Sequence, residues 1–245
     1  MSETYINNQK IHYLVEGKTN KPPLILVHGI FVDTSEYKEL FEILITKYRV
    51  YAFDLPGHGK SDKANKKTKL STIVDDFISN LKLKNPTILG TSAGAIFAVN
   101  YASKNKNIKE LILLNPAGLK YNSNTTLFFK LLIDEYILQR RKDKPKLKTR
   151  TEPKSDNKRI KRNIKRNIFN FYFWRAFLKL NKKDQSNLLR KIKCRTRLFF
   201  GTKDILFPKG YAKKYIKCFK NPEVHFIEGG HSWPRKNSQL FKKYL

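Results

Sequence analysis

Short apolar runs that stop at turn-forming residues recur along this chain, and segments with helical spacing lie between them. A continuous apolar run indicates a strand that is buried on both faces, because a strand with one solvated face alternates apolar and polar residues. Strands that alternate with helices favour a mostly parallel sheet with helices on both faces, an α/β fold. Strands are predicted at residues 11–15, 24–27, 50–53, 86–89, 111–114, 197–200 and 224–227.

The segments between these strands predict the covering helices. Residues 71–83 place Ile73 and Phe77 on one side of a helix and Asp76 on the other. Such a two-sided pattern is typical of a helix that packs on a sheet and faces water. From their spacing and their places between the strands we expect helices at residues 36–47, 71–83, 95–103 and 211–219.

The alternation stops between residues 117 and 190, where no strand pattern appears and basic residues gather. This stretch carries a net charge of +15 out of +31 for the chain of 245 residues. We therefore predict one α/β core domain formed by residues 1–116 and 191–245, with residues 117–190 as a helical insertion above the sheet. A chain of this length can bury a single large core.

Two cysteines, Cys194 and Cys218, are too few for a disulfide framework and have no metal-like spacing. A reducing compartment is expected. The first residues lack the apolar run of a signal peptide, and no stretch has 18 consecutive apolar residues. We therefore expect a cytoplasmic protein.

A Gly90-Thr91-Ser92-Ala93-Gly94 segment matches the pattern G-x-S-x-G and lies between a predicted strand and a predicted helix. The pattern alone is common by chance, but in this context it indicates a nucleophile. A strand that turns abruptly into a helix strains the central residue, and small neighbours let the chain pass close to itself. We predict that Ser92 is the nucleophile.

A serine hydroxyl needs a base within hydrogen-bond reach and an acid that orients the base. Among five histidines, His231 follows a predicted strand and the Gly229-Gly230 pair, so it is the predicted base. Asp204 follows the strand before it and is the predicted acid, although a lone loop Asp is more often a turn former. Asn115, after the strand at 111–114, is set aside because it is not a carboxylate.

The residues around this predicted triad resemble the α/β-hydrolase fold family. Residues 54–62 are similar to its D-x-x-G-x-G-x-S turn, a structural signature, and His28-Gly29 resembles its oxyanion loop. The resemblance implies that the backbone N–H groups of Ile30 and Ala93 hold the developing oxyanion. It also implies that the insertion is a helical cap over the site.

Ser at the nucleophile position argues against dehalogenase and epoxide hydrolase chemistry, and the sequence lacks an H-G-G-G loop. The expected activity is hydrolysis of a carboxylic ester or thioester of an apolar acyl substrate through an acyl-enzyme. No cofactor and no metal are expected. Apolar residues at 127–133 and 168–174 could line a pocket, although packing of the cap on the sheet explains most of them.

Residues 140–166 carry a net charge of +11, which fits a solvated face, an AT-rich genome or an acidic partner. One alternative function is therefore an esterase that acts on acyl-carrier-protein-bound methyl esters, similar in outline to the pimeloyl-carrier-protein methyl ester esterases. Arg159, Arg162 and Arg166 would dock the acidic partner or an anionic membrane. Another is a non-catalytic lipid- or protein-binding protein. No nucleic-acid motif is present, and the oligomeric state stays open.

Overall fold

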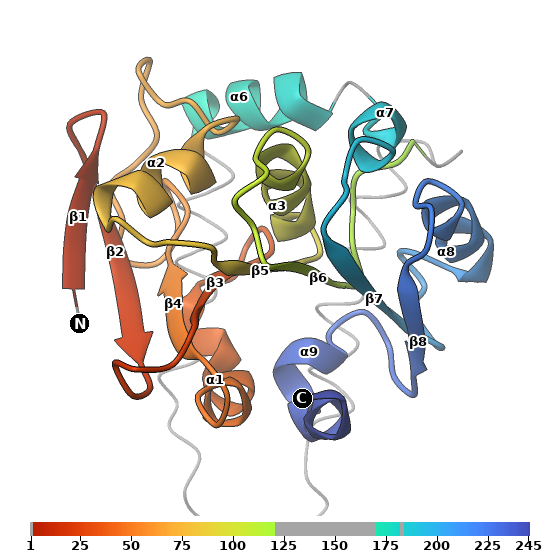
Figure 1. Ribbon diagram of the computed structural model, residues 1–245. Helices are drawn as coiled ribbons and strands as arrows, with labels where there is room; N and C mark the ends of the chain where they lie inside the picture. The colour runs from red at the N-terminus through yellow and green to blue at the C-terminus, as the bar shows by residue number, and fades with distance from the viewer. Residues whose placement is uncertain (1, 121–169, 182–183) are drawn as a thin grey trace, which may run out of the picture.

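The computed structural model describes residues 2–120, 170–181 and 184–245 (Figure 1). The strands of this part form one sheet in the order β1-β2-β4-β3-β5-β6-β7-β8. Strands β1 and β2 run antiparallel to their neighbours, and the strands from β4 to β8 in this order are parallel. The strands are β1 (Ser2–Ile6), β2 (Gln9–Glu16), β3 (Pro23–Val27), β4 (Arg49–Phe53), β5 (Thr87–Thr91), β6 (Glu110–Leu114), β7 (Arg195–Gly201) and β8 (Glu223–Ile227).

Each strand expected from an apolar or alternating run is present. The apolar residues of β3 and β6 are buried, as expected for strands covered on both faces. No strand is expected from the sequence at β1, which forms a hairpin with β2 at the edge of the sheet. Asn7 and Asn8 close this hairpin with φ values of 52° and 60°, a two-residue turn that asparagine tolerates.

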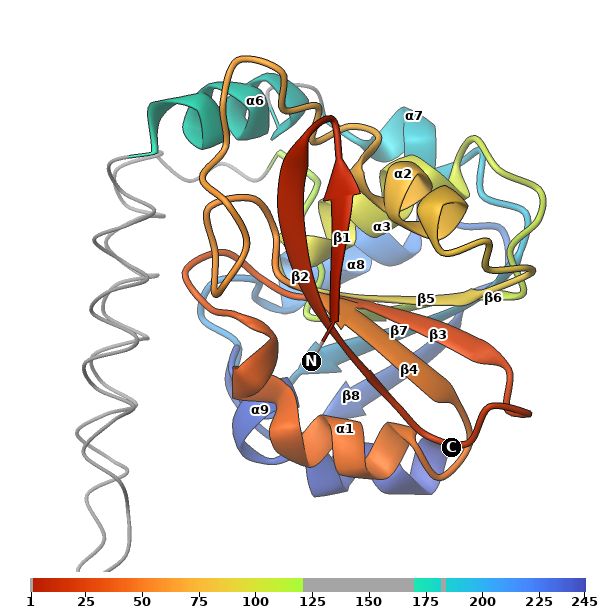
Figure 2. The same ribbon diagram turned by 90° about the vertical axis from the view of Figure 1, so that its left-hand side faces the viewer.

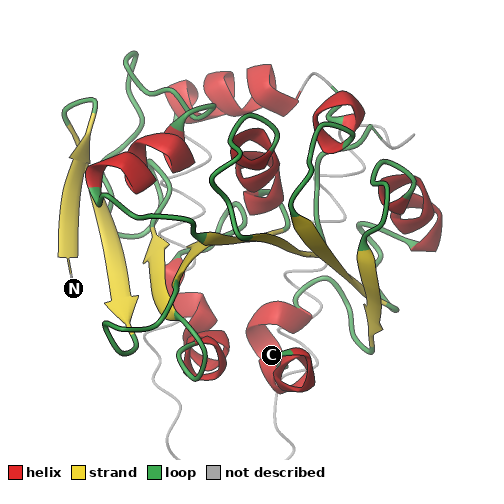
Figure 3. Cartoon of the chain, in the orientation of Figure 1, coloured by secondary structure: helices red, strands yellow, loops and turns green. Residues whose placement is uncertain are grey.

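Helices cover both faces of the sheet, as Figures 1 and 3 show. One face carries α1, α9 and the final 3-10 helix η2, and the other face carries α2, α3 and α8. A further 3-10 helix, η1, precedes α1. The bounds are η1 (Thr34–Tyr37), α1 (Lys38–Leu44), α2 (Ile73–Asn80), α3 (Gly94–Ala102), α8 (Lys209–Ile216), α9 (Trp233–Lys236) and η2 (Ser238–Tyr244).

Two apolar layers hold the helices to the sheet. On the α3 side, Phe77 and Phe97 pack with the aromatic side chains of α8. On the α1 side, Leu40 and Phe41 pack with Phe241 from η2. Burial of large side chains on both faces is the main stabilising contribution in such a fold.

Two helices of the predicted insertion lie within the described residues, α6 (Phe171–Asn181) and α7 (Ser186–Leu189). Figure 2 shows α6 as an outer element beyond α3, on the side of the sheet that α2 and α3 cover. Residues 121–169 and 182–183, and with them most of the predicted insertion, lie outside the described residues. The boundaries 117 and 190 stay a prediction.

The strand order reverses between β3 and β5, because the chain passes from β3 to β4 on one side and then to β5 on the other. In open α/β sheets, reactive residues gather at the carboxyl ends of the strands beside such a reversal. His28 directly follows β3 and Ser92 directly follows β5. Within the described residues, no helix is long and apolar enough to cross a membrane.

Candidate active site

Ser92 occupies the sharp turn between β5 and α3, where it has a φ of 50°. Non-glycine residues rarely adopt this left-handed conformation, so the surrounding structure must hold it in place. The Ser92 N–H donates to the Leu114 carbonyl at 3.0 Å, and the Ser92 carbonyl accepts from Ala117 at 3.0 Å. A Cβ at Gly94 would lie 2.1 Å from the Val27 carbonyl oxygen, so the turn needs glycine there. The sharp strand-to-helix turn predicted for residues 90–94 is therefore present.

The structure brings the predicted nucleophile, base and acid together. The Nε2 atom of His231 lies 2.8 Å from the Ser92 Oγ, and its Nδ1 atom lies 2.8 Å from the Asp204 Oδ2. Because an ionised carboxylate only accepts hydrogen bonds, Asp204 fixes the imidazole proton on Nδ1. The Nε2 atom is then free to accept the Ser92 proton, which is the arrangement that general-base activation requires.

Asp204 is buried in the loop between β7 and α8. Its Oδ1 atom accepts hydrogen bonds from the backbone N–H groups of Leu206 at 2.8 Å and Phe207 at 2.9 Å. The two carboxylate oxygens thus have separate partners. Oδ1 accepts from the backbone, and Oδ2 faces His231. The turn-forming role weighed for Asp204 and the role toward His231 are therefore both present in the geometry.

The loop that carries His231 is held by Asn115, a residue that the sequence does not predict to be part of the site. The Asn115 side chain is buried, donates from Nδ2 to the His231 carbonyl at 2.8 Å and accepts at Oδ1 from the Gly201 N–H at 2.7 Å. It therefore ties together the ends of three strands, β6, β7 and β8. The sequence signal was weak, since an Asn after a strand is usually a turn residue.

The predicted oxyanion loop passes beside the nucleophile. A Cβ at Gly29 would lie 3.3 Å from the Ser92 Cβ, so the backbone of this loop lies close to the reacting oxygen. Within the described residues, the backbone N–H groups of Ile30 and Ala93 donate no hydrogen bond. Two unused N–H donors next to a serine nucleophile are what stabilisation of an oxyanion requires.

Two buried histidines fix the shape of this loop. His28 Nδ1 donates to the Gly29 carbonyl at 2.6 Å, while its Nε2 accepts from the Leu55 N–H at 2.9 Å. Burial lowers the pKa of His28, so the ring stays neutral and keeps this pair of roles. His58 Nε2 accepts from the Phe31 N–H at 3.3 Å on the other side of the loop.

The turn at residues 54–62 acts as a structural support, as its resemblance to the family signature implies. Asp54 is buried and accepts hydrogen bonds from His12 Nδ1, Thr34 N–H and Lys60 N–H, each at 2.9 Å. Burial by itself raises the pKa of Asp54, but the hydrogen bond from His12 and the backbone donors outweigh burial and hold the pKa well below its usual range. His12 therefore supports the turn and does not approach Ser92.

Aromatic side chains of α6 lie against the oxyanion loop and the supporting turn. The ring centroids of Trp174 and Phe31 are 5.7 Å apart, and those of Phe173 and His58 are 4.9 Å apart. Phe173 is fully buried, whereas Phe171 is exposed. The described part of the apolar segment predicted at 168–174, residues 170–174, thus packs partly on the core, and its Trp174 lies next to the site.

The remaining predicted residues fall into two groups. Arg159, Arg162 and Arg166 lie outside the described residues, and so does the apolar segment at 127–133. His225 lies in β8, where it pairs with Glu223 at 2.8 Å and has no contact with the triad. Within the described part of the chain, no three His, Cys, Asp or Glu side chains are grouped so that they could hold a metal ion.

Comparison with known proteins agrees with this geometry. The model of the alpha/beta hydrolase fold family matches residues 22–233. The AB hydrolase superfamily protein YisY of Bacillus subtilis is 24% identical, over 93% of this chain and 91% of its own length.

Solved structures share the whole fold. A bacterial membrane phospholipase A matches with a TM-score of 0.78 at 20% identity, over 99% of this chain and 84% of its own. The enol-lactonase from Burkholderia xenovorans matches with a TM-score of 0.74 at 17% identity, over 99% and 97%. With the family model extending from before β3 to the loop that carries His231, the chain belongs to the alpha/beta hydrolase fold family.

Proposed function

We propose that this protein is a serine hydrolase that cleaves a carboxylic ester or thioester of an apolar acyl substrate. The observation that carries the proposal is the continuous hydrogen-bond chain from Ser92 Oγ through His231 to Asp204, with both distances at 2.8 Å. A serine in a strained turn with such a base beside it is prepared for nucleophilic attack. Membership of a hydrolase family supports the same reaction class.

We infer the steps of the proposed reaction from the positions of these atoms. Ser92 Oγ attacks the acyl carbonyl carbon while His231 Nε2 takes the hydroxyl proton, and Asp204 stabilises the imidazolium that forms. The backbone N–H groups of Ile30 and Ala93 donate to the carbonyl oxygen as it becomes negative, and one such donor contributes about 2.7–4 kcal/mol in other serine enzymes. His231 then gives the proton to the leaving alcohol or thiol. Water hydrolyses the resulting acyl-enzyme by the reverse sequence.

The side chains around the triad favour an apolar acyl group. Phe207 lies edge-on to His231, with ring centroids 5.2 Å apart, and Trp174 lies over Phe31 of the oxyanion loop. Apolar and aromatic walls with a few placed polar groups are typical of sites for apolar ligands. Because a phospholipase A and an enol-lactonase share the fold, acyl esters and lactones are the first substrates to test.

A fluorophosphonate probe followed by p-nitrophenyl esters of rising chain length tests the proposal. We expect the probe to label Ser92 alone, as peptide mass spectrometry would show, and the Ser92→Ala variant to lose both labelling and ester turnover. Its melting temperature should stay near that of the wild type, because the side chain is not part of the core. A folded wild-type protein with neither labelling nor turnover would favour the non-catalytic binding protein instead.

A narrower proposal concerns the partner. The predicted insertion carries +15 of the net charge of +31, and this supports docking of an acidic carrier protein or an anionic membrane by Arg159, Arg162 and Arg166. An acyl group presented by such a partner would reach Ser92 as a thioester or a distal ester. Salt dependence tests this part of the proposal separately.

A further inference from the structure

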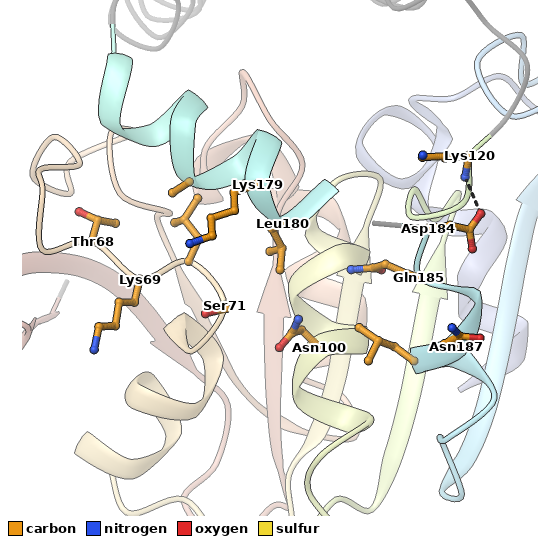
Figure 4. Close-up of a pocket in the computed structure, with 13 residues that line it drawn as sticks. Thr68, Lys69, Ser71, Asn100, Lys120, Lys179, Leu180, Asp184, Gln185 and Asn187 are labelled. Carbon is orange, nitrogen blue, oxygen red and sulfur yellow. Dashed lines mark hydrogen bonds between the residues drawn. The ribbon is translucent and has the colours of Figure 1, made fainter. Parts of the chain in front are cut away.

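A cavity of about 690 Å³ lies under the second half of α6, away from the triad. The loop before α2, the helix α3 and the segment at residues 184–188 form its other walls (Figure 4). None of Ser92, Asp204 or His231 lines it. Its volume falls within the range of small-molecule sites, roughly 300–1,000 Å³. The lining residues are Thr68, Lys69, Leu70, Ser71, Asn100, Lys120, Ala176, Lys179, Leu180, Asp184, Gln185, Asn187 and Leu188.

The apolar lining of this cavity is aliphatic. Leu70, Ala176, Leu180 and Leu188 contribute to its walls, and no aromatic side chain of the described residues lines it. In Figure 4, Leu180 points from α6 toward Asn100 of α3. The surroundings of the triad differ, because there Phe31, Trp174 and Phe207 supply the apolar surface. An aliphatic chain fits these walls better than a flat ring does.

Lys179 contributes a positive charge at one side of the cavity. Lys179 points from α6 toward the loop that carries Ser71, and no carboxylate of the described residues pairs with its Nζ. The Ser71 hydroxyl, within the same part of the chain, makes no hydrogen bond to protein either. An ammonium and a hydroxyl together can bind a carboxylate or another small anionic head group.

At the opposite side of the cavity, a negative charge lies beside a positive one. Asp184 lies there beside Lys120, and its carboxylate accepts from the Lys120 N–H at 3.1 Å and the Ser186 N–H at 2.8 Å. Hydrogen bonds to Ser186 and Lys120 and the Lys120 charge outweigh the effect of burial, so the pKa of Asp184 is lowered and the group is anionic. An anionic head group is therefore favoured at the Lys179 side and disfavoured at the Asp184 side. The cavity thus has a polarity that orients a ligand.

We propose that this cavity is a second binding site for an aliphatic carboxylate, with the head group at Lys179 and Ser71 and the chain along Leu180 and Leu188. The site does not depend on the proposed hydrolysis, since it contains no triad residue. It is joined to the active site by α6, whose first half carries Phe173 and Trp174 against His58 and Phe31.

Calorimetric titration of the protein with dodecanoate, below its micelle concentration, tests the site. Lys179→Gln should weaken binding about two- to fivefold, the usual effect of removing one exposed ionic contact. Leu180→Trp should weaken binding more than about tenfold, because it displaces methylene groups that each contribute roughly a fourfold factor in affinity. Dodecanol should bind less tightly than dodecanoate, and acetate should not bind at the same concentrations.

Matched controls on the same helix separate the cavity from other sites. Arg175 and Leu178 are exposed residues of α6 that do not line the cavity. Arg175→Gln and Leu178→Trp should therefore leave dodecanoate affinity within twofold of the wild type. Absence of dodecanoate binding, or equal affinity in Lys179→Gln, Leu180→Trp and both controls, would overturn the site. Binding in the active site alone gives the second result, and because the readout is affinity, a failure of the hydrolase proposal leaves this test intact.

Discussion

At the scale of single residues, Asp204 has two tasks that one substitution can separate. In Asp204→Asn the Oδ1 acceptor for the Leu206 and Phe207 N–H groups can remain, while an NH₂ group replaces the oxygen that faces His231. This amide forces the imidazole proton onto Nε2. The Nε2 atom can then no longer accept the Ser92 proton. We expect kcat to fall about 10⁴-fold with little change in KM, as in the related triad case.

Steady-state kinetics on one p-nitrophenyl ester measures this effect. A thermal unfolding curve of the same variant should show a small change, because the backbone hydrogen bonds persist. A loss in kcat of less than about tenfold would mean that another carboxylate orients His231, and Asp204 would then be a turn residue only.

Asn115 is a positioning residue by the same geometry, and its effect should appear in kcat. Asn115→Ala leaves the Gly201 N–H and the His231 carbonyl without their partner, which costs about 2–6 kcal/mol of stability for two buried groups. The His231 loop should then shift relative to Ser92. We expect kcat to fall about 10- to 100-fold with KM within a few fold, because small displacements of a catalytic base are costly.

Asn105→Ala provides the matched control for this variant. It also removes two amide hydrogen bonds, to Asp75 at 2.8 Å and to the Tyr101 carbonyl at 3.0 Å, but at the far end of α3. Stability should fall in both variants, whereas kcat should fall only in Asn115→Ala. Wild-type kcat in a folded Asn115→Ala protein would rule out the positioning role.

At the scale of elements, the turn at residues 54–62 links the oxyanion loop to the sheet, and its stability depends on pH. The folded pKa of Asp54 lies below the unfolded value of about 3.9, so ionised Asp54 stabilises the fold above that pH. This contribution is lost as the pH falls through the folded pKa. The wild type should therefore melt at a higher temperature than Asp54→Asn at pH 7, and the gap should narrow below about pH 4.

Melting temperatures of the two proteins between pH 7 and pH 3 test this prediction. The direction in which the gap in melting temperature changes with pH is informative, because a group with a raised folded pKa would give the opposite trend. A gap in melting temperature that stays constant over the range would show that Asp54 acts through the shape of its hydrogen bonds and that its charge contributes nothing.

The elements also show what the sequence could and could not predict. The sequence predicts β3 and β6 because both faces of these strands are buried, so their residues form continuous apolar runs. Polar residues interrupt the apolar residues of the edge strand β1, which pairs only with β2. Its sequence therefore resembles that of a loop. The short helix α9, which begins Trp233-Pro234, shows no helical period at all.

The site divides in the same way. Local sequence patterns predict Ser92 and His231, because each has glycines beside a reactive side chain that follows a strand. Asn115 acts through a carbonyl more than a hundred positions away in the chain, and no local pattern records that contact. Residues that support a site from several strand ends are identified only once the strand order is known.

At the scale of the whole molecule, the charge of +31 and the position of the site suggest different roles for different surfaces. The triad lies at the carboxyl ends of the parallel strands, and the most basic stretch of sequence is inserted between β6 and β7. Lys191, Lys193 and Lys220 are exposed at the other edge, where β7 and β8 begin. Binding of a partner that presents its acyl group to Ser92 should depend on the charges of the insertion. It should not depend on the charges at the far edge.

Salt dependence of turnover tests this directly. If an acidic carrier protein or an anionic membrane presents the substrate, kcat/KM should fall steeply between about 50 and 500 mM salt, because the Debye length shrinks to several Å. A small neutral ester should barely respond. Reversing Arg159, Arg162 and Arg166 to Glu should raise KM for the presented substrate and leave the small ester within a few fold, whereas reversing Lys191, Lys193 and Lys220 should leave both unchanged. Equal and weak salt dependence for the two substrates, with no difference between the two triple reversals, would leave genome composition as the explanation of the charge.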